Sequence, residues 1–321
     1  MKTVATLWFV AISSLTAHAA EPLPASVVDG WMETLSNWGR WGKDDELGTL
    51  NLITPATRIA AAKLVIEGRS VSMAHETITK QSVDAASPYS HEMVAHAENS
   101  PMWAVDNIAV TFHGYSHSHL DAVCHRFHKG KIYNGYASTT ANSSGCGKLA
   151  VTTASDGIFT RGVLMDIARL KNKKWLEPGT PIYAEDLEAW ERKAGVTVGK
   201  GDAVFIRTGR WARRAEMGPW DIEQSAAGLH VSAVKWLKDR DIAILGCDGV
   251  SDVFPSGVEG YTHPVHLLVL VALGMPMFDN LDLEAVSKVA ADENRWHFLL
   301  TAAPLKIPGG TGSPLNPIAT F

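Results

Sequence analysis

The sequence contains little cysteine, no cluster of basic residues and no internal repeat. Its 321 residues include three cysteines, Cys124, Cys146 and Cys247. Because an odd number cannot all pair internally, at most one disulfide can form, and a small disulfide-stabilised scaffold is excluded. With no run of Lys and Arg and a formal net charge of -5, we expect no nucleic-acid partner. A hydrophobic share of 46% suffices for a large core, so we expect a single domain over residues 20–321.

A long apolar run is also missing, apart from the first residues of the chain. Residues 1–19 have the pattern of a signal peptide: Lys2 supplies a positive charge, residues 4–15 are mostly apolar, and residues 17–19 form a small-x-small cleavage site. The apolar run is too short to span a bilayer, although a retained membrane anchor is the alternative. The sequence therefore predicts an exported protein, periplasmic or secreted, with no stable membrane insertion after cleavage.

Histidine, in contrast, is concentrated in one short stretch, with five of the 13 histidines between residues 113 and 128. If residues 115–121 are extended, alternate side chains share one face, so His117, His119 and Asp121 project together. Two imidazoles and a carboxylate can hold a divalent metal and leave coordination positions open for water. We therefore predict one divalent metal ion, either Mn²⁺ or Zn²⁺, since this donor set suits both.

Side chains around this stretch are candidates for catalysis and substrate binding. His125 lies four residues beyond Asp121 and is interpreted as a general acid/base, with a fourth ligand or an orienting residue as the alternative. Tyr115 shares the face of the ligands and is a candidate to hydrogen-bond substrate or water. Trp41 belongs to a glycine-rich aromatic segment, which packs loops or forms a wall for a flat substrate. Cys124 is interpreted as a small buried packing residue.

Helical and strand patterns alternate from about residue 160 to residue 280, which favours an α/β architecture with a buried sheet. Helices are expected over residues 25–38, 55–67, 184–193 and 226–238, and strands over residues 108–112, 163–167, 203–206 and 242–246. Further polar residues are each interpreted as structural or peripheral when taken alone: His113, His128, Arg207, Arg210, His230, Asp248, Asp252, His263, His266 and Asp279.

Residues 115–125, YSHSHLDAVCH, resemble the pattern H-x-G-T-H-x-D-x-P-x-H of the metal-dependent cyclase family, which includes bacterial kynurenine formamidase and isatin hydrolase. The resemblance implies that His119 and Asp121 are metal ligands and that His125 is the proton donor or acceptor. The first family His falls on Tyr115 and the Gly falls on His117, which we take as the substitute third ligand.

Three further segments extend the resemblance over most of the mature chain: residues 36–51, 202–209 and 273–281. In the last of these, Asp279 stands where the family usually carries the Glu of a second metal site. The nearest His before it is His266, one residue out of register with the family's spacing.

The resemblance implies a swivelling β/α/β domain that usually assembles as a homodimer or a higher oligomer; we expect a homodimer. It also implies that metal-activated hydroxide attacks an amide, imide or ester carbonyl. We therefore expect a hydrolase for a small aromatic or cyclic carbonyl compound, cleaving the C–N bond of a cyclic amide or an aryl formamide. The alternatives are a lactone or ester hydrolase with the same metal site, and a non-catalytic exported protein that binds a metal or ligand.

Overall fold

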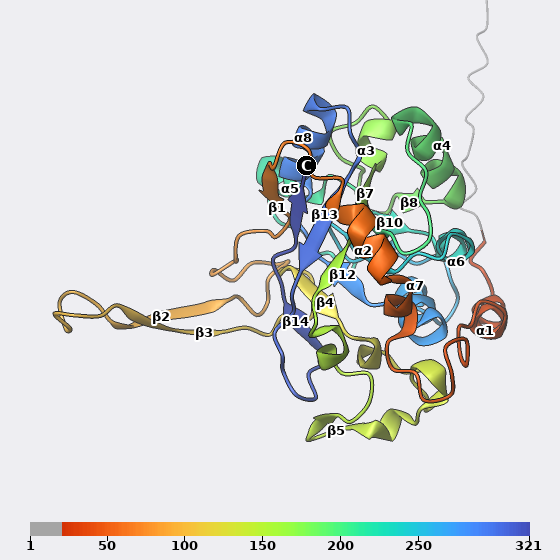
Figure 1. Ribbon diagram of the computed structural model, residues 1–321, viewed down its shortest axis with the longest axis horizontal. Helices are drawn as coiled ribbons and strands as arrows, with labels where there is room; N and C mark the ends of the chain where they lie inside the picture. The colour runs from red at the N-terminus through yellow and green to blue at the C-terminus, as the bar shows by residue number, and fades with distance from the viewer. Residues whose placement is uncertain (1–20) are drawn as a thin grey trace, which may run out of the picture.

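The computed structural model describes residues 21–321, so the predicted signal peptide lies outside the described residues. A curved mixed sheet of nine strands forms the centre of the molecule (Figure 1). In spatial order the strands are β1 (Ser70–Ser72), β15 (Ile318–Thr320), β13 (His297–Ala302), β7 (Ile158–Asp166), β9 (Ala203–Arg207), β11 (Ile244–Cys247), β12 (Met277–Asp279), β4 (His119–Asp121) and β14 (Gly312–Pro314). The predicted α/β architecture is thereby confirmed.

The four middle strands of the sheet, β7, β9, β11 and β12, run parallel, and the strands on either side of them pair antiparallel. All five residues of β9 and all four of β11 are buried. Such continuous apolar runs are typical of parallel strands that are covered on both faces. Antiparallel pairing places β4 between β12 and β14, which brings residues 119–121 against two segments from the C-terminal part of the chain.

Eight α-helices surround this sheet in the described part of the chain. They are α1 (Ala25–Thr34), α2 (Pro55–Ala62), α3 (Ile167–Leu170), α4 (Ala184–Ala194), α5 (Arg210–Met217), α6 (Val234–Asp239), α7 (Pro264–His266) and α8 (Glu284–Asp292). The Thr54 side chain caps α2 by accepting a hydrogen bond from the Thr57 amide, and α4 ends at Gly195 with a positive φ of 62°, as the sequence pattern indicates. No helix within residues 21–321 has the length and apolar character needed to cross a membrane.

Short 3₁₀ helices, a π-helix and three small strand pairs complete the fold. The 3₁₀ helices are η1 (Gly48–Leu52), η2 (Val123–His125), η3 (Tyr133–Gly135), η4 (Ser138–Thr140), η5 (Val151–Ala154) and η6 (Val231–Ala233), and the π-helix is η7 (Leu267–Leu273). The small pairs are β2 (Ser90–Ala95) with β3 (Val105–Ala109), β5 (Ala141–Asn142) with β6 (Gly145–Cys146), and β8 (Pro181–Ile182) with β10 (Gly228–Leu229).

Two elements differ from the sequence-based expectation. The helix expected over residues 226–238 is confined to η6 and α6, because β10 pairs with β8 and the Ala226 amide donates to Phe254. Tertiary pairing thus overrides the helical spacing of this segment. The strand expected over residues 108–112 ends at Ala109 and belongs to β3, outside the main sheet.

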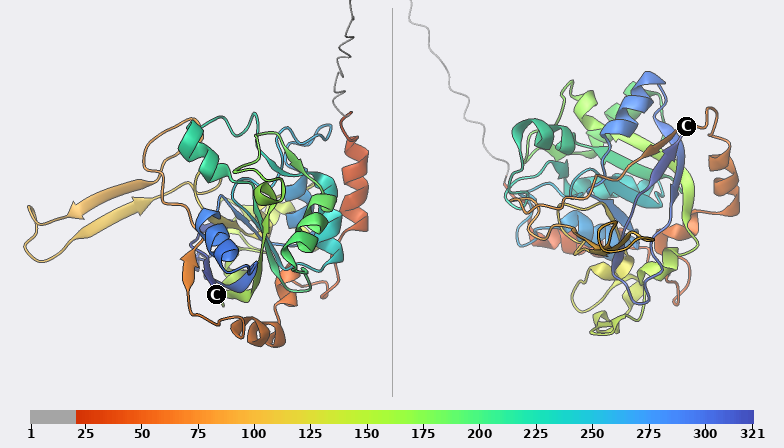
Figure 2. Two further views of the ribbon diagram at one scale, coloured as in Figure 1. Left: turned by 90° about the horizontal axis from the view of Figure 1, so that it is seen from above. Right: turned by 90° about the vertical axis from the view of Figure 1, so that its left-hand side faces the viewer.

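The β2–β3 hairpin projects from the body as a long arm (Figures 1 and 2). All residues of its two strands are exposed except Ala95. The arm nevertheless carries large apolar side chains, namely Met93, Val94, Met102, Trp103, Val105 and Ile108, which are between 44% and 71% exposed. An isolated two-stranded ribbon is marginally stable in water, so this arm lacks the cover that a third strand or a helix would give.

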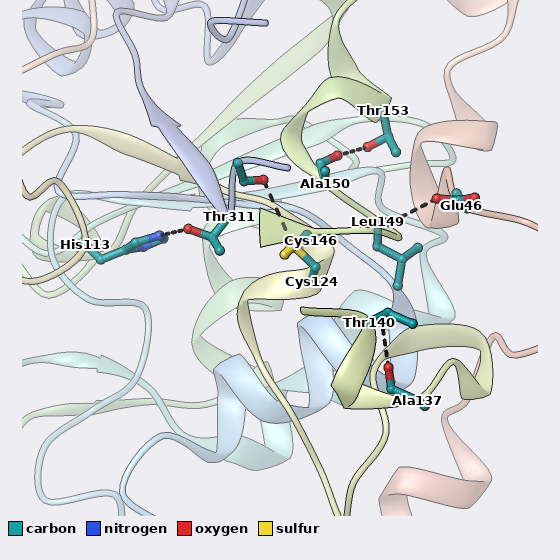
Figure 3. The surroundings of a disulfide bond; sticks show 11 residues. Glu46, His113, Cys124, Ala137, Thr140, Cys146, Leu149, Ala150, Thr153 and Thr311 are labelled. Atoms are coloured by element: carbon teal, nitrogen blue, oxygen red, sulfur yellow. Dashed lines mark hydrogen bonds between the residues drawn. A yellow bond between two sulfur atoms is a disulfide. The ribbon is translucent and has the colours of Figure 1, made fainter. Parts of the chain in front are cut away.

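A disulfide joins Cys124 in η2 to Cys146 in β6 (Figure 3). The interpretation of Cys124 as a packing residue is corrected here, because β6 brings the second sulfur to it, while Cys247 stays buried and unpaired. The bridge ties η2, and with it the neighbouring His125, to a segment that is also held by the hydrogen bond from the Cys146 amide to the Gly309 carbonyl.

We predict that this disulfide contributes substantially to stability. It closes a loop with a sequence separation of 22, and the loss of chain entropy in the unfolded state corresponds to about 3 kcal/mol. The double substitution Cys124→Ala and Cys146→Ala should lower the free energy of unfolding in urea by about this amount. Reductant should destabilise the wild-type protein equally and leave the double variant unchanged; a wild-type protein that is insensitive to reductant would contradict the prediction.

Candidate functional site

A cavity of about 310 Å³ lies where β4 and β12 run side by side. In this antiparallel pair His119 is opposite Asp279, and Asp121 follows His119 by two residues. Because directly opposed residues and residues two apart share one face of a sheet, these three side chains point to the same side. Each of them is at most 3% exposed, so the floor of the cavity consists of buried polar groups.

Three donor atoms converge at one end of this floor. Nδ1 of His113 lies 2.9 Å from Oδ1 of Asp121, and Nε2 of His119 lies 3.3 Å from the same oxygen. Although Nδ1 of His113 and Oδ1 of Asp121 are buried, neither makes a hydrogen bond within residues 21–321. Buried polar atoms are ordinarily paired, and two imidazoles with one carboxylate suit a divalent cation. The geometry therefore fits a metal held by His113, His119 and Asp121.

The outer nitrogens of both imidazoles are already engaged, which leaves the inner nitrogens free for a metal. Nδ1 of His119 donates to the His117 carbonyl oxygen at 2.7 Å, and Nε2 of His113 lies 2.9 Å from the Thr311 hydroxyl (Figure 3). Such hydrogen bonds fix the ring orientation and the tautomer of metal-binding histidines. Gly312, next to Thr311, allows the backbones of β14 and β4 to approach closely, since a Cβ at Gly312 would lie 2.3 Å from the Leu120 carbonyl oxygen.

A second group of donors shares Asp121 with the first. Oδ2 of Asp121 lies 3.8 Å from Nε2 of His266, and that nitrogen lies 2.9 Å from Oδ2 of Asp279. Nδ1 of His266 donates to Asp252 at 2.5 Å, an arrangement that directs Nε2 toward the cavity. Asp121, His266 and Asp279 thus form a further candidate metal group, and the roles of His266 and Asp279 that the sequence left open are those of potential ligands.

The pKa shifts at this floor follow from its burial and its charges. Burial alone would lower the pKa of His266, but the carboxylates of Asp279 and Asp252 outweigh it and raise the pKa well above its usual value. Burial opposes ionisation of Asp121, yet its histidine neighbours hold the pKa of that carboxyl well below its usual range. The carboxylates of Asp121, Asp252 and Asp279 are all buried around His266. Their negative charge favours a positively charged group in the cavity.

His125 lies at the side of this group, on η2. Its ring stacks on His113 with 3.9 Å between centroids, and its Nε2 is 4.0 Å from Oδ2 of Asp121. Burial lowers the pKa of His125 to about 4, so the ring is neutral at pH 7. The structure therefore brings this predicted acid/base residue to the cavity, adjacent to the donor atoms.

Of the two predicted substrate-binding residues, the structure brings one to the cavity. Tyr115 lines it, and burial together with the Glu223 charge raises the pKa of the phenol to about 12, so the hydroxyl stays a donor. Trp41 is not among the lining residues; it packs against the core beneath the guanidinium of Arg40, 4.7 Å from its ring centre. Of the two interpretations of this aromatic segment, loop packing rather than a wall for the substrate agrees with the position of Trp41.

His117 does not join His119 and Asp121, which corrects the expectation from alternating residues. Its Nε2 lies 3.1 Å from the Ser87 carbonyl oxygen, and its ring lines a separate cavity beside Tyr89. The reason is that β4 begins only at His119, while residues 113–117 form a turn and a bend. Alternation between faces holds only for extended backbone.

The same turn returns His113 to the site as the third donor, a role that the sequence analysis missed. The signal for it was the glycine that follows, because Gly114 has a φ of 128°, a conformation that L side chains rarely adopt. Arg210 and Asn280 hold this turn by donating to the carbonyl oxygens of Tyr115 and Gly114. His128, in contrast, is peripheral, with Nε2 3.6 Å from Asp29.

Comparisons with known proteins agree with this fold. The family model described as "Putative cyclase" matches residues 83–252. A crystal structure described as that of a novel cyclase is 32% identical in sequence, covers 90% of this chain and 99% of that chain, and has a TM-score of 0.81. A comparison with curated proteins finds no match.

Two isatin hydrolases are more distant structural relatives. Isatin hydrolase A from Ralstonia solanacearum is 22% identical, with 82% of this chain and 94% of that chain covered and a TM-score of 0.56. Isatin hydrolase A from Labrenzia aggregata, bound to benzyl benzoate, is 21% identical, with 84% and 100% covered and a TM-score of 0.58. At this identity the likeness establishes a shared fold. The family match over more than half of the chain, together with the 32% identical cyclase structure, shows that this chain belongs to the cyclase family.

Proposed function

We propose that this protein is a metal-dependent hydrolase that cleaves the C–N bond of a cyclic amide or an aryl formamide. The observation that carries the proposal is the convergence of His113, His119 and Asp121 in a buried cavity. Nδ1 of His113 and Nε2 of His119 lie 2.9 and 3.3 Å from Oδ1 of Asp121, and that oxygen makes no hydrogen bond within the described residues. When bound there, a divalent cation such as Mn²⁺ or Zn²⁺ would polarise a carbonyl and lower the pKa of a coordinated water. The fold shared with the isatin hydrolases supports this reaction class by analogy.

His125 is the residue that we assign to proton transfer. Its ring is neutral at pH 7 and faces the cavity, so Nε2 can accept the proton that the attacking water loses. As the C–N bond breaks, the same nitrogen returns that proton to the departing nitrogen. The disulfide at Cys124 and the stack on His113 hold the ring in place for both transfers.

The space beside the metal cavity indicates the kind of substrate. A second cavity of about 700 Å³ shares Tyr115, Glu223 and His263 with the first, and Phe254 and Tyr261 line it further out. Aromatic walls of this kind favour a flat ring. Tyr115 lines both cavities, and we assign its protonated hydroxyl to donate a hydrogen bond to a substrate carbonyl. These residues take the role that the sequence analysis gave to Trp41.

Other carbonyl substrates remain alternatives at the same site. A lactone or ester would use the same ligands and the same proton carrier, so a substrate panel distinguishes it from an amide. A non-catalytic exported binding protein would hold metal and turn over none of these compounds. The periplasmic or secreted location stays a prediction that rests on residues 1–19.

The position of the third ligand gives a matched pair of variants. We predict that His113→Gln loses most of the bound metal, because Nδ1 of His113 is one of the three converging donors. His117→Gln should keep the metal content of the wild-type protein, since His117 faces Ser87. Metal analysis after dialysis against Mn²⁺ or Zn²⁺ checks both variants; loss of metal in the His117 variant alone would reverse the assignment.

The reaction itself is tested with isatin, N-formylkynurenine and a set of lactones. We predict that turnover disappears after chelation and returns when metal is restored. His125→Ala should retain its metal while kcat falls by about 10²–10⁴-fold, the usual contribution of a general acid/base. If metal is lost with this substitution, His125 is a ligand; if metal binds and no substrate reacts in the wild-type protein, the hydrolase proposal fails.

The predicted homodimer is best tested on the β2–β3 arm. Its residues include Glu92, Glu98 and Asp106, and the chain has no Lys or Arg between residues 81 and 125. Because two such arms would repel each other, we expect each arm to lie on the body of a second copy. That contact would bury the apolar side chains of the arm.

We predict that light scattering finds a dimer for the wild-type protein. The double substitution Met102→Ser and Trp103→Ser at the arm, where the side chains are 71% and 66% exposed, should shift the protein toward monomers. The control Ile66→Ser removes an apolar side chain that is 76% exposed elsewhere on the body and should leave the dimer intact. A monomeric wild-type protein would contradict the prediction.

A further inference from the structure

Arg126 is a cation that lines the metal cavity without an acidic partner. It follows η2 directly and has an extended backbone, with φ of -120° and ψ of 142°. Within the described residues its guanidinium forms no ion pair within 4.0 Å, and its buried Nε makes no hydrogen bond. Arg210 and Arg213 also have a buried Nε without a hydrogen bond, but their guanidinium groups lie within 4.0 Å of the carboxylates of Asp84 and Glu177. Arg207 and Arg214 are likewise paired, with Asp166 and Asp84. Arg126 is half-buried, and its Nε is a buried polar atom without the hydrogen bond that such atoms ordinarily make.

The surroundings of Arg126 do not supply that partner. Glu223 lines the same cavity but forms no ion pair with Arg126 among the described residues. His263, which borders both cavities, carries no negative charge in either protonation state and so cannot neutralise the guanidinium. The guanidinium therefore remains available to an anion that enters the cavity.

We infer that Arg126 binds a carboxylate of the ligand, so that the natural substrate is a carbonyl compound that carries a carboxylate or generates one on the same molecule. This inference rests on the proposed hydrolase function and names the substrate class of the same site. The planar guanidinium offers paired N–H donors that match the two oxygens of a carboxylate. Neutral or ammonium-bearing ligands would leave this charge uncompensated.

The two possible sources of the carboxylate follow from the reaction. When water adds to the carbonyl of a cyclic amide, the C–N bond breaks, the carbonyl carbon becomes a carboxylate, and the nitrogen leaves as an amine on the same molecule. Alternatively, the substrate carries its own carboxylate next to the scissile amide. Because Arg126 and His125 are consecutive and both line the cavity, a carboxylate at Arg126 places the departing nitrogen near His125.

The binding test compares benzoate with benzamide, which has a similar shape and no charge. Calorimetry on the metal-loaded and the metal-free protein gives both affinities. Arg126→Gln should weaken benzoate binding about tenfold or more, the usual loss for a hydrogen bond to a charged group, and change benzamide binding less than twofold. Arg126→Lys should keep part of the benzoate affinity. The control Arg192→Gln alters an exposed arginine on α4 and should change neither.

Kinetics then separate the two sources of the carboxylate. With N-formylanthranilate and formanilide as a matched pair, a higher KM for the first alone in Arg126→Gln indicates a carboxylate of the substrate. With neutral isatin, an unchanged KM and weaker inhibition by the ring-opened product indicate the newly formed carboxylate.

Three outcomes would overturn the inference: no benzoate binding by the wild-type protein, equal benzoate affinity in wild type and Arg126→Gln, or equal weakening of benzoate and benzamide. The last would mean that the substitution damages the cavity rather than an anion site. If benzoate binding depends on Arg126 but the wild-type protein hydrolyses none of the carbonyl substrates, the hydrolase proposal fails and the anion site stands. If the wild-type protein hydrolyses these substrates and Arg126→Gln changes neither binding nor kinetics, the hydrolase proposal stands and the anion site fails.

Discussion

The burial of the Asp121 carboxylate is the constraint on which the site depends. A carboxylate that is 2% exposed is costly unless positive charge or hydrogen-bond donors surround it. One oxygen faces His113 and His119, and the other faces His266 at 3.8 Å. Each imidazole is directed by a hydrogen bond on its outer nitrogen. The floor of the cavity is thus a set of potential ligands in fixed positions. Its excess negative charge would be compensated by a divalent cation.

The sheet explains how such a set can be rigid. The strand β4 contains only three residues, but it is hydrogen-bonded on one side to β12 and on the other to β14. This double pairing fixes His119 and Asp121 relative to Asp279, and the hydroxyl of Thr311, the residue before β14, supports His113. A site built on paired strands holds its ligands more firmly than one built on loops alone.

The residues around the potential metal ligands have two roles: some hold the backbone of the site in place, and one is available to bind a ligand. Arg210 and Asn280 secure the turn that carries His113 and Tyr115, and the Cys124–Cys146 bridge secures η2. Arg126 has no comparable structural partner within the described residues. Arg207, Arg210 and Arg214 each lie within 4.0 Å of a carboxylate, whereas Arg126 has no such partner within the described residues. This contrast is the reason to assign Arg126 to the ligand.

Several features could be predicted from the sequence because they depend on neighbouring residues. The apolar runs of β9 and β11 indicate buried strands, Thr54 with Pro55 starts α2, and the two-residue spacing of His119 and Asp121 places both on one face. The family resemblance was confirmed by the match over residues 83–252.

Other features were decided by the tertiary structure alone. Whether His113 or His117 meets Asp121 depends on where extended backbone begins, and the pairing of β4 sets that point at His119. Asp279 reaches the site because β12 lies beside β4, and His266, at the end of α7, is held there by hydrogen bonds to Asp252 and Asp279. More than 140 residues separate both from Asp121 in the chain. Periodicity describes side chains along one element, whereas the convergence of distant donors follows from the order in which the strands pair.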